Sequence, residues 1–252
     1  MGCLYLIILF NLLYFAVVQH KFKKRSIVTQ NIIEIKELKK HYSENTVLSD
    51  LNLNIPQNSI LSVIGPNGCG KTTLFKLILG ITDKNSGEIS ITPGARKGFM
   101  LDDCEPYEYL SLVQNLKAFS KISEIKINKN YIDYIISTSF CEKIKNKAYR
   151  SLSAGQKKKS LFAMSFINDP DMFILDEPLN SLDLKERIDM ISSIKYLKEA
   201  KNKTILISSH DLASLYELCD IFCFLKNGKI CRTVEKKDID ADSLHRIYLE
   251  IF

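Results

Sequence analysis

Apolar and polar positions follow a strand-and-helix rhythm from residue 31 onward. Residues 32–38 and 51–55 alternate between apolar and polar side chains, which predicts two half-exposed strands. Three further segments are almost continuously apolar, as is typical of strands buried on both faces: Ile60–Ile64, Met172–Leu175 and Thr204–Ser208.

Segments with helical spacing lie between these strands. Residues 72–79 have it directly after the first buried strand, and the middle of the chain has it most clearly at 110–119 and 131–136. Strands that alternate with helices in this order predict an α/β fold, with a mostly parallel sheet covered by helices.

The first residues differ from the rest of the chain. Residues 3–18 are apolar apart from Asn11, and a basic stretch follows at 20–25. A helix of about 16 residues reaches roughly 24 Å, slightly less than the ~30 Å hydrocarbon core of a bilayer. Three interpretations of residues 1–30 remain open: a short membrane anchor with its basic flank in the cytoplasm, a helix that packs on a membrane partner, and an extension from an upstream start site.

The composition excludes several classes of protein. The net charge of +6 is spread along the chain in short clusters, whereas nucleic-acid binders usually gather basic residues into a stripe, so no nucleic-acid partner is expected. The seven cysteines include no CxxC pair, which argues against zinc sites and disulfides and favours a reducing compartment. Cys219 and Cys223, four residues apart, are expected to be small buried hydrophobic residues.

The strongest chemical motif follows the strand at 60–64 and precedes the helix at 72–79. It fits G-x-x-x-x-G-K-[ST], the phosphate-binding loop, with Gly65, Pro66, Asn67, Gly68, Cys69, Gly70, Lys71 and Thr72. Glycines let backbone N–H groups surround a phosphate, and the helix N-terminus adds its positive dipole end. Lys71 is expected to reach the β- and γ-phosphates, and the Thr72 hydroxyl to bind Mg²⁺.

A pair of carboxylates ends the buried strand at 172–175. After a phosphate-binding loop, Asp176 is expected to hold Mg²⁺ through water and Glu177 to orient the attacking water. Alone, such a pair is often no more than a charged strand end.

Together with other motifs in the same order, these residues resemble the ABC (ATP-binding cassette) ATPase family. Leu152, Ser153, Ala154, Gly155 and Gln156 resemble its LSGGQ signature, with Ala154 in place of a glycine. Residues 168–170, 176–178 and 180–183 resemble its NDP, DEP and D-loop motifs, and His210 its switch histidine. Tyr42 matches the aromatic residue that stacks on adenine. The resemblance covers about residues 32–230.

The resemblance implies a fold, a site and partners. It implies a P-loop NTPase (RecA-like) core, an antiparallel β subdomain, and a helical subdomain at about 103–160 within a domain of residues 31–252. ATP would contact Tyr42 and residues 65–73, including Thr73, while Glu177, His210 and Lys71 would be catalytic. A second cassette, identical or different, would present its signature to this ATP, and transmembrane permease subunits would place the chain at the cytoplasmic face of a membrane.

Asp102 departs from the family pattern, and Cys69 within the phosphate-binding loop has two interpretations. Where the family has the glutamine that contacts Mg²⁺ and water, this chain has Asp102, a shorter, charged and acceptable metal ligand; substitution by Asp103 or by a bound water is the alternative. Cys69 lies at a helix N-terminus, where thiol pKa values fall, so a redox switch is weighed against a small filler residue.

The short segment after His210 favours an exporter, because it leaves no room for a sizeable regulatory domain. The sequence leaves two other functions open: a soluble ABC ATPase without a transport role, and a binding-only regulatory cassette. The intact Lys71, Glu177 and His210 disfavour the second, and Asp102 is its one support.

Overall fold

The computed structural model describes residues 30–101, 103–104 and 106–252. The three interpretations of residues 1–30 concern a segment of which the structure describes only residue 30. No helix among the described residues is long and apolar enough to cross a membrane.

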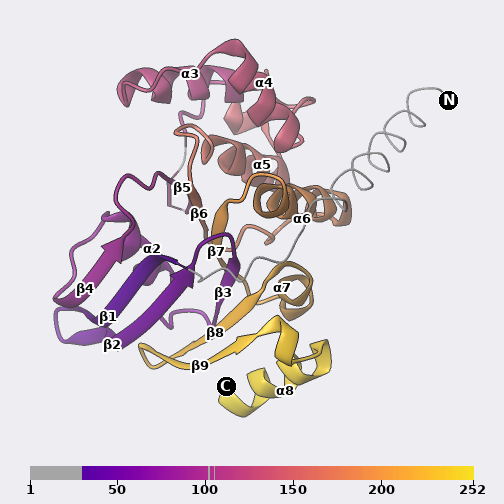
Figure 1. Ribbon diagram of the computed structural model, residues 1–252. Helices are drawn as coiled ribbons and strands as arrows, with labels where there is room; N and C mark the ends of the chain where they lie inside the picture. The colour runs from indigo at the N-terminus through magenta and orange to yellow at the C-terminus, as the bar shows by residue number, and fades with distance from the viewer. Residues whose placement is uncertain (1–29, 102, 105) are drawn as a thin grey trace.

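A three-stranded antiparallel sheet forms one side of the molecule (Figure 1). Its order is β2-β1-β4, with β1 at Asn31–Tyr42, β2 at Asn45–Pro56 and β4 at Ser86–Ile91. The first two strands are longer than their alternating segments predicted, because register shifts interrupt the alternation without ending the pairing. Glu37 and Asp50 have positive φ angles of 49° and 51° in these strands.

The second sheet has six strands in the order β5-β6-β7-β3-β8-β9. They are β5 (Lys97–Met100), β6 (Met172–Leu175), β7 (Thr204–Ser208), β3 (Ile60–Ile64), β8 (Ile221–Lys226) and β9 (Lys229–Glu235). Adjacent strands are parallel from β5 to β8, and β9 pairs antiparallel with β8. The three predicted buried strands are therefore confirmed with their predicted bounds.

Seven α-helices complete the described chain: α2 (Lys71–Leu79), α3 (Leu112–Ile122), α4 (Lys129–Thr138), α5 (Ala154–Met164), α6 (Leu184–Glu199), α7 (Leu212–Leu218) and α8 (Ala241–Ile251). Short 3₁₀ turns lie at Tyr149–Ser151 and Lys236–Asp238. The helices α3 and α4 lie at one end of the molecule, away from the three-stranded sheet (Figure 1). The helix α3 begins later than the periodicity at 110–119 predicted, because Ser111 caps it in a capping box with Gln114.

The parallel sheet is buried because each face has its own hydrophobic core. Ile60 and Ile64 of β3 belong to a core that includes residues of helices α3 to α8, while Leu61 and Val63 belong to a core that includes α2 and the three-stranded sheet. This two-sided burial explains the continuous apolar sequence of β3. It also leaves the carboxyl ends of the strands, where polar residues follow, to form a site.

Candidate active site

The loop between β3 and α2 has a backbone that glycine permits. Gly68 and Gly70 have φ angles of 80° and 110°, values that other residues rarely adopt. A Cβ atom on Gly65 would lie 2.6 Å from the carbonyl oxygen of Leu225. These residues therefore bring backbone groups close together at the N-terminus of α2, as a phosphate-binding loop requires.

Lys71, the first residue of α2, turns its buried side chain back over this loop. Its Nζ donates hydrogen bonds to the carbonyl oxygens of Gly65 at 2.7 Å and Pro66 at 3.2 Å. The same Nζ lies 3.8 Å from Oε1 of Glu177. The structure thus places a buried ammonium group between the loop and the end of β6.

Asp176 joins three elements at the end of β6. Its Oδ2 accepts a hydrogen bond of 2.5 Å from the Thr72 hydroxyl, and its Oδ1 accepts one of 2.5 Å from the Ser208 hydroxyl. Hydroxyl and carboxylate oxygens are the ligands that Mg²⁺ prefers, so Thr72 and Asp176 fit the predicted magnesium site. The described residues contain no group of three or more His, Cys, Asp or Glu side chains that could hold a metal ion by themselves.

Glu177 is held by its backbone, and its carboxylate lies between Lys71 and His210 without a hydrogen bond to either. Its φ angle is 46°, its N–H donates to Ser208 Oγ at 2.8 Å, and its carbonyl accepts from Lys158 Nζ at 3.2 Å. Both carboxylate oxygens are buried, and neither has a hydrogen-bond partner among the described residues. Oε2 lies 3.2 Å from Nδ1 of His210. A buried carboxylate in this state is suited to accept a hydrogen bond from a bound water.

Lys71, Thr72, Asp176 and Glu177 line a cavity of about 560 Å³, whereas Ser208 and His210 are not among its lining residues. Its walls comprise Val47, Asn67, Gly68, Gly70, Lys71, Thr72, Thr73, Asp103, Asp176, Glu177 and Asn180. Two residues of the site were missed from the sequence. Val47 carries no motif, and Ser208 was assigned only to a buried strand, although a serine at the end of an apolar strand was a usable signal.

Tyr42 lies at the end of β1, about half exposed, with Lys40 Nζ 4.6 Å from its ring centroid. It lines neither the cavity around Lys71 nor a neighbouring cavity of about 690 Å³ bordered by Pro66 and Cys69. Its stacking on adenine stays a prediction.

The structure corrects one expectation about Cys69. Burial raises the pKa of its thiol, although it lies just before a helix N-terminus. The pKa argument for a redox switch is therefore wrong. A Cβ atom on Gly65 would lie 2.6 Å from Cys69 Sγ, so the sulfur fills space inside the loop, as a small filler does.

The signature residues lie at the start of α5, apart from this cavity. Ser153 is the N-cap of α5 and forms a capping box with Gln156. Gly155 is buried against α6, where an added Cβ atom would lie 1.8 Å from Oε2 of Glu186. None of Leu152, Ser153, Ala154, Gly155 and Gln156 lines the cavity around Lys71. One chain therefore does not bring the two motifs into one pocket.

Asp102 lies outside the described residues, so its predicted contact with Mg²⁺ stays a prediction. Its neighbour Asp103 lines the cavity around Lys71. Asp103 also forms a hydrogen-bonded ion pair with Lys76 of α2, and that hydrogen bond holds the pKa of the Asp103 carboxyl below its usual value.

The fold and the site together define a class. A phosphate-binding loop after a central parallel strand, facing two carboxylates at the end of another, is the active site of a P-loop ATPase. The family model described as "ABC transporter" matches residues 48–180. The chain is also 31% identical over 227 residues to a lantibiotic transport ATP-binding protein of Streptococcus pyogenes, covering 86% of this chain and 96% of that protein. It belongs to the ABC transporter family, as one of its ATP-hydrolysing, ATP-binding subunits.

Another relative and two solved structures are likewise ATP-binding proteins or cassettes of transporters. A zinc import ATP-binding protein of Rickettsia prowazekii is 34% identical over 217 residues, covering 84% of this chain and 90% of that protein. A solved ATP-binding subunit of an ABC transporter has a TM-score of 0.75 at 25% identity, covering 87% of this chain and 99% of that one. A dimeric bacterial ABC transporter cassette has a TM-score of 0.73 at 22% identity, covering 81% and 98%, and shows the same fold.

Proposed function

We propose that this chain is the motor of a membrane transporter and that its site works with the roles expected from the sequence. The observation that supports this is the position of the buried Glu177 carboxylate, which lies 3.8 Å from Lys71 Nζ and 3.2 Å from His210 Nδ1. Lys71 exchanges its two carbonyl partners for the β- and γ-phosphates, Glu177 orients the attacking water, and His210 senses the γ-phosphate. Phosphoryl transfer needs such positioning and charge neutralisation more than covalent help.

Magnesium fits the oxygen ligands at the same place. When bound, Mg²⁺ neutralises charge that develops on the phosphates. Thr72 would hold the ion directly and Asp176 through water. Ser208 keeps the Asp176 carboxylate oriented through its hydrogen bond to Oδ1.

A second cassette completes the nucleotide site. The signature residues of one chain lie away from that chain's phosphate-binding loop, so a head-to-tail dimer brings the Ser153 of one chain to the ATP of the other. Exposure of Ser153 and Ala154 at the start of α5 supports this arrangement, since both are accessible to a partner.

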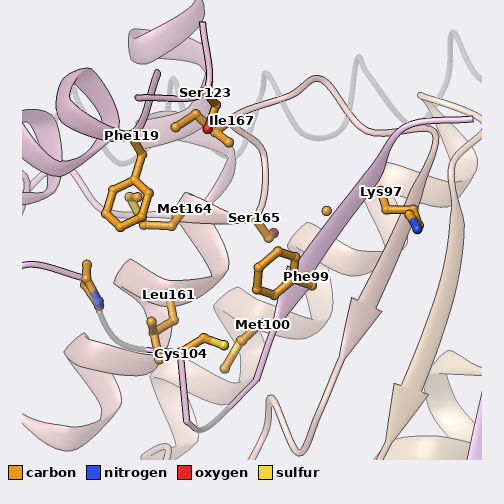
Figure 2. Close-up of a pocket in the computed structure, with 12 residues that line it drawn as sticks. Lys97, Phe99, Met100, Cys104, Phe119, Ser123, Leu161, Met164, Ser165 and Ile167 are labelled. Carbon is orange, nitrogen blue, oxygen red and sulfur yellow. The ribbon is translucent and has the colours of Figure 1, made fainter. Parts of the chain in front are cut away.

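A transmembrane subunit is the other proposed partner, and an apolar cavity of about 430 Å³ is the place for it to dock. The cavity lies between β5 and the helices α3 and α5 (Figure 2). Phe99, Phe119 and Met164 line it, and the exposed rings of Tyr107 and Tyr109 lie nearby in sequence. An apolar helix end of a membrane subunit fits this surface. Because the surface is formed by both β5 and α3, a subunit bound there would follow movement of α3 relative to the sheet.

The expected direction, export, stays a prediction. The expectation of export depended on the short segment after His210. However, this chain matches 90% of the length of a relative named for zinc import. Compactness therefore does not distinguish exporters from importers. Transport into inside-out vesicles, once the membrane partner is identified, measures the direction.

The first experiment is MgATP turnover by the complete chain beside Glu177→Gln, with ATP-dependent dimerisation followed by size-exclusion chromatography. We expect turnover by the native chain, and an ATP-bound dimer that accumulates without turnover in Glu177→Gln. Lys71→Ala, which removes phosphate binding, is the control that does not dimerise. Hydrolysis that is equal in the native chain and Glu177→Gln would contradict the proposed role of this carboxylate.

A further inference from the structure

Three consecutive lysines of α5 reach three different partners. Lys157 Nζ lies 5.1 Å from the ring centroid of Tyr149, and Lys159 Nζ lies 2.9 Å from Oδ2 of Asp189. Between them, Lys158 Nζ donates a hydrogen bond of 3.2 Å to the backbone carbonyl of Glu177. Successive residues point about 100° apart around a helix, so this triplet is a set of distinct contacts rather than one basic patch.

The Lys158 contact falls on a residue whose backbone is in a sparsely populated conformation. Glu177 is a non-glycine residue with a φ angle of 46°, in the left-handed region. Such a conformation persists where the surroundings determine it, and here hydrogen bonds hold the residue on both sides. Ser208 accepts from its N–H, and Lys158 donates to its C=O.

The direction of the Glu177 carboxylate depends on this backbone. The carboxylate oxygens lie 3.8 Å from Lys71 Nζ and 3.2 Å from His210 Nδ1, but neither oxygen forms a hydrogen bond with a described residue, so the backbone is the hydrogen-bonded part of Glu177. Rotation about the N–Cα bond of Glu177 moves its carbonyl and its side chain together, so a hydrogen bond that holds the carbonyl also restrains the direction of the carboxylate.

Lys158 also lies in the helix that begins with the signature. Ser153 caps α5, and the N–H of Lys157 donates to the Ser153 carbonyl at 2.8 Å. In the proposed dimer, the signature loop contacts a nucleotide held by the second chain. That contact lies about one helical turn along α5 from Lys158, which holds the carbonyl of Glu177.

We propose that Lys158 is a positioning residue for Glu177, and that it ties the orientation of this carboxylate to the signature loop of the same chain. This rests on the proposed role of Glu177 in hydrolysis. This contact is to the backbone carbonyl of Glu177 and not to the phosphate-binding loop, so we expect its loss to lower turnover more than nucleotide binding.

The test compares Lys158→Met, which keeps the length and removes the donor, with Lys158→Arg, which keeps a donor. Lys157→Met is the matched control on the same helix. We expect Lys158→Met to lower kcat by about 10- to 100-fold, because a displacement on the order of 1 Å has this effect on catalysis. KM for MgATP should change by less than about threefold, since ground-state binding is retained. Lys158→Arg should recover most of kcat, and Lys157→Met should retain it.

Glu177→Gln, measured beside these variants, separates the two proposals. If Glu177→Gln abolishes turnover and Lys158→Met leaves kcat unchanged, the role of Lys158 is overturned and that of Glu177 stands. A crystal structure of Lys158→Met provides a readout that does not depend on activity. We expect Glu177 to leave the left-handed region in this variant, and an unchanged φ angle would overturn the proposal even if no variant hydrolyses ATP.

Discussion

The Thr72 hydroxyl lies 2.5 Å from Oδ2 of Asp176, although 104 residues separate them in the chain. This hydrogen bond joins the first turn of α2 to the end of β6. It brings together the two residues that the sequence assigned to magnesium from separate motifs.

Replacing Asp176 by asparagine should raise the Mg²⁺ concentration needed for half-maximal turnover by about 10- to 100-fold, as is typical when a group that orients a metal's bound water is altered. The amide keeps the size of the carboxylate and removes its charge. Turnover measured against free Mg²⁺ at constant ATP checks this. Asp171→Asn is the control, because Asp171 lies before the opposite end of β6 and pairs with Arg96. An unchanged Mg²⁺ requirement in Asp176→Asn would contradict the metal assignment.

Replacing His210 by alanine should lower kcat by about 10²-fold or more, in the range found when a group that assists proton or phosphoryl transfer is removed. His210 is mostly exposed, and its Nδ1 lies 3.2 Å from Glu177 Oε2. The loss should therefore arise in turnover without a loss of stability, which thermal unfolding measures. His245→Ala, an exposed position on α8, is the matched control. Full activity in His210→Ala would show that the contact with Glu177 has no catalytic part.

Cys69 should react slowly with iodoacetamide at neutral pH. Burial raises the pKa of its thiol, so the reactive thiolate forms at higher pH than in an ordinary cysteine, and labelling should keep rising above pH 9. Mass spectrometry of the labelled chain compares it with Cys231, which is exposed. MgATP should slow the reaction of Cys69 further, because the thiol lies within the phosphate-binding loop. Faster labelling of Cys69 than of Cys231 at pH 7 would restore the redox hypothesis.

Replacing Lys159 by methionine should lower the free energy of unfolding by about 3 kcal/mol, because it leaves the Asp189 carboxylate buried without its main partner. Both side chains are largely buried, and their charged atoms lie 2.9 Å apart. Urea unfolding measures the loss. Lys185 lies 3.4 Å from the same carboxylate but is exposed, so Lys185→Met should change stability by about 0.5 kcal/mol or less.

A matched hydrophobic pair tests the cause of that loss. Lys159→Met combined with Asp189→Leu should recover most of the stability, since a buried ion pair is often replaced by apolar side chains at little cost. If the double variant is as unstable as the sum of the single ones, packing rather than the unpaired charge explains the effect.

Local sequence determined the parts of this protein that depend on periodicity and backbone conformation. The buried strands at 60–64, 172–175 and 204–208 followed from continuous apolar runs, because a parallel strand is covered on both faces. The phosphate-binding loop followed from the spacing of Gly65, Gly70 and Lys71, because such a loop needs residues without a Cβ atom at close approaches. Capping shifted the start of α3 by only two residues, since helix ends depend on one side chain.

Tertiary structure alone decided which distant groups share an environment. Ser208 bridges Asp176 and Glu177, and Lys158 holds the carbonyl of Glu177, although no spacing along the chain relates these residues. Burial reversed the expectation for the pKa of Cys69, because desolvation of the thiolate outweighs the adjacent helix N-terminus. Both outcomes depend on distances across the folded chain, which a periodic pattern or a motif of neighbouring residues does not contain.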